Sequence, residues 1–222
     1  EQGRFYSLYV TGPDADQERE KTVRAEFERR CDQHGLSRSW IVESGDAGRA
    51  IVARAHWADL IVLSAQAEGL SASERALSAT FQTVARRAPR PVLAALGTCS
   101  QLSRALLAYD GSPESEEALL VAAYAGRQWG LPLAVVTVEE HRRADEGTLQ
   151  KAATYLSEHG VQAQALLRHG VAAEAILATA REVACDWLIM GASGYSPFGQ
   201  LFTRSTVQRV LREAPCPVLL CR

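Results

Sequence analysis

The sequence lacks the features that mark several special classes of protein. No run of apolar residues approaches the ~18 that a membrane-spanning helix needs, and no secretory segment opens the chain. The formal net charge is only −2, so there is no charge excess to attract nucleic acid or an anionic membrane. With 47% hydrophobic and 23% charged residues, the composition is that of an ordinary globular protein.

Cysteine is also scarce. The five cysteines are an odd number without a C-x-x-C pair: Cys31, Cys99, Cys185, Cys216 and Cys221. This pattern argues against a disulfide framework and against a zinc site, and it predicts reduced thiols in a cytoplasmic protein. Cys216 and Cys221 lie close together in sequence, which leaves a redox role open beside the simpler interpretation of buried small hydrophobic residues.

What the chain does contain is a long internal repeat. His34-Gly35 recurs as His159-Gly160, an offset of 125 residues. The segment 88–93, Ala-Pro-Arg-Pro-Val-Leu, recurs at 214–219 as Ala-Pro-Cys-Pro-Val-Leu, an offset of 126. A period of this length indicates two copies of one domain, which we predict at 1–98 and 102–222.

The second copy alternates strand and helix patterns. We predict strands at 104–109, 133–138, 163–168, 187–190 and 217–222, with helices at 114–129, 149–159, 172–183 and 203–213. Strands that are apolar on both faces are typical of a parallel sheet covered by helices on both sides. The fold prediction is therefore α/β, with two doubly wound, mostly parallel five-stranded sheets.

The first copy follows the same pattern only from its second strand onward. Its strands are predicted at 5–11, 39–42, 59–63 and 91–96, and its helices at 22–34, 48–56 and 78–87. A counterpart of 104–129 is missing, and we expect an upstream segment to supply it. Because the first strand of a doubly wound sheet is usually central, its absence should split the first copy's sheet in two.

A glycine-rich turn follows the buried strand of the second copy. Gly191 and Gly194 stand at its carboxyl end, and Ser205 and Thr206 open the next helix. Glycines there let backbone N–H groups approach a phosphate, and a hydroxyl at a helix N-terminus adds to the favourable field. Ser205 is equally suitable as a plain helix cap. Asp110, at the end of the copy's first strand, could bond an adenine or ribose, or simply form a turn and cap.

These residues resemble the universal stress protein family over 104–222. The resemblance is carried by Leu-Ala-Tyr-Asp-Gly-Ser at 107–112, by the segment 186–191 with Gly194, and by 210–219. It implies a cytoplasmic protein with five-stranded sheets that often binds ATP, alone or with Mg²⁺. It also implies a homodimer, or pairing of tandem copies, through the last strand, and the edge of 217–222 would then be available to another copy.

The same resemblance implies a site for the nucleotide. Asp110 would recognise adenine with the backbone around Ala108 and Tyr109, Val138 would pack on the base, and the remaining residues would hold ribose and phosphates: Gly191, Gly194, Arg204, Ser205 and Thr206. Position 204 departs from the family motif, which has glycine there. Arg204 could block the phosphates, bind them, or be a solvated loop residue.

The first copy lacks the motif, because Ser64 and Ala67 replace its glycines and Ala79 and Thr80 stand at its hydroxyl position. We predict that it binds no nucleotide and serves as a packing partner. The whole chain is then predicted to be an ATP-binding stress-response regulator with one site. The alternative is a tandem scaffold that acts through protein contacts alone. No positioned base or metal-binding set is recognised, so an enzyme is not predicted beyond slow ATP hydrolysis.

Overall fold

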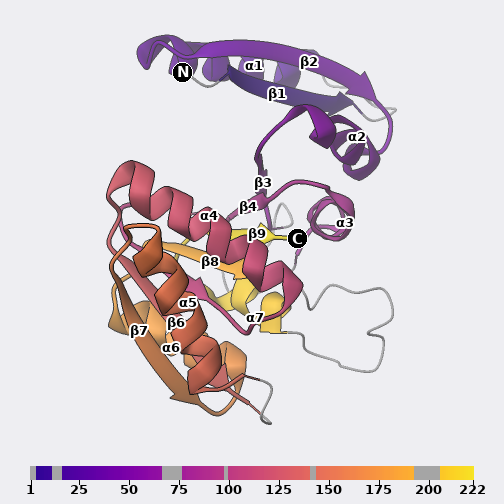
Figure 1. Cartoon of the computed structure of the whole chain (residues 1–222). Helices are drawn as coiled ribbons and strands as arrows, with labels where there is room; N and C mark the ends of the chain where they lie inside the picture. Colours follow the sequence, from indigo (N-terminus) through magenta and orange to yellow (C-terminus); the bar gives the residue numbers. More distant parts are fainter. Residues whose placement is uncertain (1–3, 12–16, 67–76, 98–99, 141–143, 193–205) are drawn as a thin grey trace. The chain divides into compact units, whose positions relative to one another are not determined.

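The computed structural model describes residues 4–11, 17–66, 77–97, 100–140, 144–192 and 206–222 (Figure 1). The chain divides into two compact units, Glu1–Arg54 and Ala55–Arg222, and each is described by itself.

The first unit is a βαβα segment. Strand β1 (Arg4–Thr11) pairs in parallel with β2 (Ser37–Ser44), helix α1 (Gln17–Gln33) connects them, and α2 (Ala47–Arg54) follows. Trp40 of β2 is the centre of its packing, with its ring 5.7 Å from that of Tyr9 and 5.9 Å from that of Phe27. Burial of these aromatic rings holds α1 against the two strands.

The second unit contains a seven-stranded sheet. Its strand order is β3-β4-β9-β8-β5-β6-β7. The bounds are β3 (Ile61–Ser64), β4 (Val92–Ala95), β5 (Ala105–Ala108), β6 (Leu133–Glu139), β7 (Ala163–His169), β8 (Trp187–Gly191) and β9 (Val218–Cys221). Every pairing is parallel except that of β4 with β9. The prediction of an α/β fold with a mostly parallel sheet is confirmed.

Helices follow the strands as the sequence predicts. A 3₁₀ turn, η1 (Ala55–Trp57), opens this unit, and the helices are α3 (Ala79–Arg87), α4 (Pro113–Trp129), α5 (Glu146–Glu158), α6 (Ala172–Glu182) and α7 (Thr206–Glu213). Local signals fix the ends of α4: Ser112 is its N-cap, Pro113 stands in the first turn, and Gly130 closes it with φ of 62°. Helix α5 begins at a capping box between Asp145 and Thr148.

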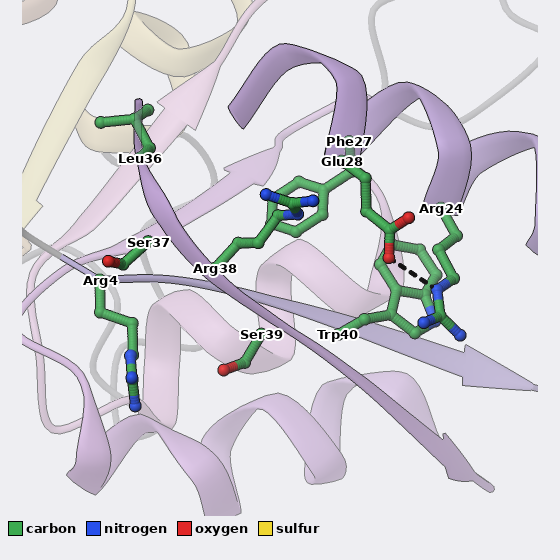
Figure 2. A pocket seen from close by; sticks show the side chains of 9 residues that line it. All are labelled: Arg4, Arg24, Phe27, Glu28, Leu36, Ser37, Arg38, Ser39 and Trp40. Atoms are coloured by element: carbon green, nitrogen blue, oxygen red, sulfur yellow. Dashed lines mark hydrogen bonds and ion pairs between the residues drawn. The ribbon is translucent and has the colours of Figure 1, made fainter. Parts of the chain in front are cut away.

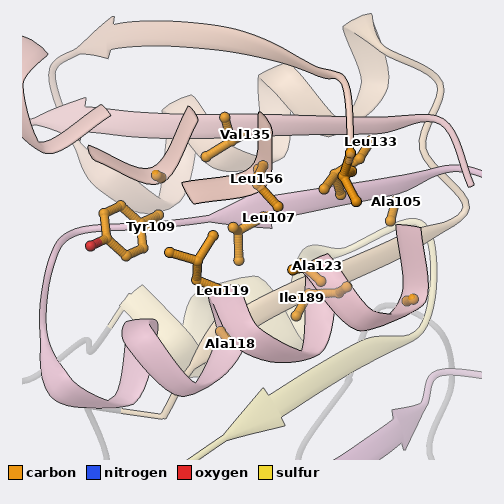
Figure 3. Packing of buried hydrophobic residues seen from close by; sticks show 14 of the residues in the cluster. Ala105, Leu107, Tyr109, Ala118, Leu119, Ala123, Leu133, Val135, Leu156 and Ile189 are labelled. Atoms are coloured by element: carbon orange, nitrogen blue, oxygen red, sulfur yellow. The ribbon is translucent and has the colours of Figure 1, made fainter. Parts of the chain in front are cut away.

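The core of this unit lies between α4, α5 and the central strands (Figure 3). Leu107 of β5, Leu119 of α4, Val135 of β6, Leu156 of α5 and Ile189 of β8 are almost fully buried in it. All four residues of β5 are buried, as expected for a strand in the middle of a covered parallel sheet. The core therefore fixes the carboxyl ends of β5, β6 and β8 relative to one another.

The prediction of two five-stranded sheets is wrong in its division of the strands. The described residues form a two-stranded and a seven-stranded sheet. In the second half of the chain, β5 pairs with both β6 and β8 and so joins the strands of that half into one sheet. The described part of the first half has no strand that pairs in this way with both β1 and β3. The strands of the first half thus belong to two different sheets, β1 with β2 and β3 with β4, which is the split that the sequence led us to expect.

The predicted domain boundary at residue 98 was placed from the sequence repeat. The boundary between the two compact units lies after Arg54 instead, because it reflects which residues contact one another. Because β4 pairs with β9, the segment from β3 to β4 belongs with the second half of the chain. Both paired strands carry the repeated Pro-Val-Leu sequence, with Val92 opposite Leu220 and Leu93 opposite Leu219. The expectation that the edge of 217–222 is open to another copy is therefore wrong, since β4 and β8 flank β9 on both sides.

Candidate functional site

The predicted site residues gather at one edge of the seven-stranded sheet. Asp110 follows β5, Val138 lies near the end of β6, and Gly191 ends β8. Parallel strands bring their carboxyl ends to the same edge, and open α/β sheets bind ligands there. Gly194, Arg204 and Ser205 lie outside the described residues. The geometry of the site therefore rests on Ala108 to Asp110, Val138, Gly191 and Thr206.

Asp110 forms the turn into α4. Its Oδ1 accepts hydrogen bonds from the backbone N–H of Ser112 at 3.0 Å and from the Ser112 hydroxyl at 2.6 Å. Ser112 in turn caps α4 by accepting from the Ser115 N–H at 3.3 Å. The turn-and-cap interpretation therefore describes the contacts of Oδ1. The Asp110 residue is exposed at the carboxyl edge of the sheet.

Ala108 and Tyr109 are bound into the sheet. The Tyr109 N–H donates to the Val136 carbonyl at 2.9 Å, and the Tyr109 carbonyl accepts from the Thr137 hydroxyl at 2.9 Å. The Tyr109 phenol is buried and donates to Glu116 Oε1 at 2.7 Å. Burial, reinforced by this carboxylate, raises the pKa of Tyr109 to about 12. Tyr109 thus contributes rigidity beneath the site, and its side chain points into the core.

Gly191 is required by packing. A Cβ at this position would lie 2.7 Å from the Glu114 carbonyl carbon and 2.7 Å from the Ser115 nitrogen, both in the first turn of α4. Only glycine lets α4 pack this closely on the end of β8. Its presence is therefore explained by the close helix–strand approach, with or without a phosphate nearby.

Two carboxylates, Glu139 and Glu140, stand at the end of β6. Glu139 lies 3.2 Å from His169 Nδ1, and Glu140 accepts from the N–H of Ala172 at 3.2 Å, at the start of α6. Val138 is half-buried beside them. Together with Asp110, this makes the described part of the edge acidic, so a polyphosphate here would need a cation or an arginine to offset repulsion.

Thr206 is the first residue of α7 and is half-buried. The apolar side of α7 is fixed by Val207, Val210 and Leu211, and Arg209 bonds Glu174 at 2.8 Å. The N-terminus of a helix carries a partial positive charge that favours anions. The amino end of α7 therefore directly follows the segment 193–205 in the sequence.

In the segment that the sequence aligns with this edge, between β3 and α3, the contacts differ. Ser64 ends β3, and the Ser78 hydroxyl caps α3 by accepting from the Phe81 N–H at 3.1 Å. Ala79 begins α3, and Ala67 lies outside the described residues. A serine one residue earlier than the motif position therefore acts as a structural cap.

The first unit contains a pocket of about 430 Å³ that no sequence pattern indicated (Figure 2). It lies between α1 and the first half of β2, and its lining residues are Arg4, Arg24, Phe27, Glu28, Leu36, Ser37, Arg38, Ser39 and Trp40. Arg24 pairs with Glu28 at 2.9 Å, and Arg38 pairs with Asp32. These ion pairs neutralise two of its three arginines.

Neither a membrane span nor a metal-binding cluster is found among the described residues. None of the helices in these ranges is long and apolar enough to cross a membrane. In the same part of the chain, no cluster of three or more His, Cys, Asp or Glu side chains could hold a metal ion.

The fold and site define an α/β protein with a doubly wound sheet and a candidate ligand edge at its strand ends. The family model described as the universal stress protein family matches residues 102–222. The chain therefore belongs to the universal stress protein family.

Relatives agree with this assignment. A universal stress protein in the QAH/OAS sulfhydrylase 3′ region of Thermus aquaticus is 36% identical over 132 residues, covering 53% of this chain and 96% of the relative. Universal stress protein Slr1230 of Synechocystis is 32% identical over 169 residues, or 74% of this chain and 58% of that protein. The match thus spans little more than half the length of Slr1230. A solved universal stress protein of Archaeoglobus fulgidus shares the fold with a TM-score of 0.84 and 21% identity, covering 99% of this chain and 87% of that one.

Proposed function

We propose that the protein is an adenine-nucleotide-binding regulator of the stress response, with one ATP site in its second half. The observation that carries the proposal is the convergence of Asp110, Val138 and Gly191 at the carboxyl edge of three adjacent parallel strands, with the N-terminus of α7 following. Asp110 and the backbone near Ala108 would recognise the base. Gly194, Arg204, Ser205 and Thr206 would hold the ribose and phosphates.

The acidic edge makes Arg204 central to this proposal. Asp110, Glu139 and Glu140 would repel a triphosphate, and an arginine or a bound Mg²⁺ would offset that charge. Binding would stabilise one arrangement of the turn at Asp110–Pro113, and a partner protein could sense that population shift. The role is regulatory, with at most slow ATP hydrolysis. We assign it to the cytoplasm because Cys31, Cys185, Cys216 and Cys221 are free thiols.

A scaffold without nucleotide is the second candidate. It is favoured by one observation: Gly191 and the Oδ1 of Asp110 have complete structural explanations in helix packing and helix capping. On this alternative the chain would act through protein contacts of its two copies or of a homodimer.

Calorimetric titration of ATP into the nucleotide-free protein tests both candidates. The parent should bind one ATP per chain if Arg204 replaces the motif glycine as a phosphate ligand, and Arg204→Gly should then bind more weakly. Binding only by Arg204→Gly would mean that the arginine closes the site. Absence of binding by both proteins would reject the nucleotide proposal in favour of the scaffold.

Asp110→Asn adds a test of base recognition. Asparagine keeps an Oδ1 acceptor for the Ser112 N–H and hydroxyl, so the turn should survive. Loss of a charged hydrogen-bond acceptor, worth about 1.5–3 kcal/mol, should weaken ATP binding roughly 10- to 100-fold. Asp46→Asn is the matched control, because Asp46 likewise accepts a hydrogen bond from a backbone N–H, that of Arg49 at 2.8 Å, and belongs to the other compact unit. Equal effects of the two substitutions would contradict a role for Asp110 in binding.

A further inference from the structure

Two buried thiols from separate elements of the fold meet at the amino ends of β8 and β9. Cys185 lies in the turn between α6 and β8, and Cys216 lies just before β9. Their sulfur atoms are 4.0 Å apart, although 31 residues separate them in the chain. The sequence pointed to Cys216 and Cys221 as neighbours, but Cys221 ends β9, whereas Cys216 precedes that strand.

The backbones that carry these thiols are held side by side. Strands β8 and β9 are parallel neighbours, and the Leu188 N–H donates to the Pro217 carbonyl at 3.0 Å. On the other side, the Cys185 N–H donates to the Ala180 carbonyl at 3.0 Å. The sulfurs need to approach by about 2 Å to reach a bond length of ~2.05 Å, a movement within the reach of side-chain rotation.

The two thiols are chemically unequal. A hydrogen bond from Cys216 lowers the pKa of Cys185, whereas the same contact, together with burial, raises the pKa of Cys216. The Asp186 carboxylate opposes the change at Cys185. Cys221 lies elsewhere in the core, where burial raises its pKa to about 12. Since the thiolate is the nucleophile, Cys185 is the member of the pair suited to react first.

We propose that Cys185 and Cys216 form a peroxide-sensitive dithiol that closes to an intramolecular disulfide. The Cys185 thiolate attacks one oxygen of hydrogen peroxide, the O–O bond breaks, and Cys185 becomes a sulfenic acid while the leaving hydroxide takes a proton to give water. The Cys216 sulfur then attacks the Cys185 sulfur, losing its proton, and the S–O bond breaks to release a second water. Two thiols are oxidised by two electrons in total, and one peroxide is reduced to two waters.

This dithiol is separate from the proposed nucleotide site. Cys185 and Cys216 lie at the amino ends of β8 and β9, whereas Asp110 and Gly191 lie at the carboxyl ends of their strands. The disulfide would tie the end of α6 to β9, the strand that pairs with β4. A stress that generates peroxide could thus stiffen this side of the sheet, whether or not ATP binds at the other.

Peptide mapping of the reduced protein after hydrogen peroxide treatment provides the test. After free thiols are alkylated in denaturant, trypsin should release peptide 182–204, which contains Cys185, joined to 213–222, which contains Cys216 and Cys221. The linked species should be about 2 Da lighter than the sum of the two peptides and should separate with dithiothreitol. The parent protein carries this readout, so it does not depend on a variant's folding.

Variants identify the partner within the second peptide. Cys221→Ser should keep the link, as should Cys31→Ser, the control for a buried thiol outside the pair. Cys216→Ser should abolish the link and leave a Cys185 sulfenic acid that dimedone traps. Mass gains of about 16 Da per oxygen without any linked peptide would overturn the proposal. So would a link that survives in Cys216→Ser or one that joins separate chains.

Discussion

Replacing Gly191 with alanine should destabilise the protein through one specific contact. The new methyl carbon would lie 2.7 Å from the Glu114 carbonyl carbon and the Ser115 nitrogen, about 1 Å inside the 3.5–4.0 Å optimum for such contacts. These are backbone atoms in a turn held by the Ser112 cap and by the Ser115 hydroxyl, which donates to the Ser112 carbonyl at 2.9 Å. Because the helix must shift, we expect a loss near the upper end of the roughly 1–3 kcal/mol that overpacking costs.

Urea unfolding of Gly191→Ala, with Gly147→Ala as the matched control, measures this cost. At Gly147 the nearest atom to an added Cβ is the Asp145 Oδ1 at 3.3 Å, which needs to shift only slightly and can keep its capping hydrogen bond from the Thr148 N–H. Alanine there should be neutral or stabilising by up to about 1 kcal/mol, because it favours the helix. For a chain of this size, a loss of about 2–3 kcal/mol corresponds to a thermal midpoint lower by roughly 4–12 °C. Equal midpoints for the two variants would refute the packing explanation of Gly191.

Three other perturbations have expected outcomes. Phenolate absorbance during an alkaline titration should show one tyrosine, Tyr109, ionising near pH 12. Because folding raises the pKa of Tyr109, the contribution of this side chain to stability is complete below about pH 10 and is lost as the pH rises toward 12. Burial alone would raise the pKa of Asp186, but hydrogen bonds led by that of the Ser103 N–H (2.9 Å to Oδ1) lower it. In urea unfolding, Asp186→Ala should therefore lower the free energy of unfolding by about 1.5–3 kcal/mol at pH 7, and by less below about pH 4, where the carboxylate becomes protonated. Ser112→Ala should cost about 1 kcal/mol by the same assay, through loss of the α4 cap.

Local sequence signals predicted most elements of the fold. The strand at Trp187–Gly191 and the helix at Pro113–Trp129 agree with the apolar runs, the proline and the glycine that bound them. Helix α1 begins at Gln17, five residues before the predicted start at Thr22. Its first turn holds Glu18 and Glu20 and has no apolar periodicity, so only the favourable interaction of acidic side chains with the helix N-terminus could have indicated it.

Strand partnership was harder to predict. The pairing of Val92 with Leu220 joins residues more than a hundred positions apart, and no local pattern specifies such a contact. The repeat identified both strands as equivalents, and only the family resemblance, through its expected pairing of last strands, suggested that they meet. The same limitation hid the Cys185–Cys216 contact, because the parallel alignment of β8 and β9 creates it.

The site residues differ in how much of their presence the fold already explains. Gly191 is needed for α4 to approach β8, and Asp110 Oδ1 forms the turn before α4. A residue that the fold itself requires would be kept even in a protein that no longer binds a ligand. The presence of such residues therefore does not distinguish a nucleotide-binding regulator from a scaffold. Arg204 has no such structural requirement in the motif, where glycine suffices. The comparison of parent with Arg204→Gly is therefore the measurement that separates the two functions, and Gly191→Ala is the one that reports on the fold beneath them.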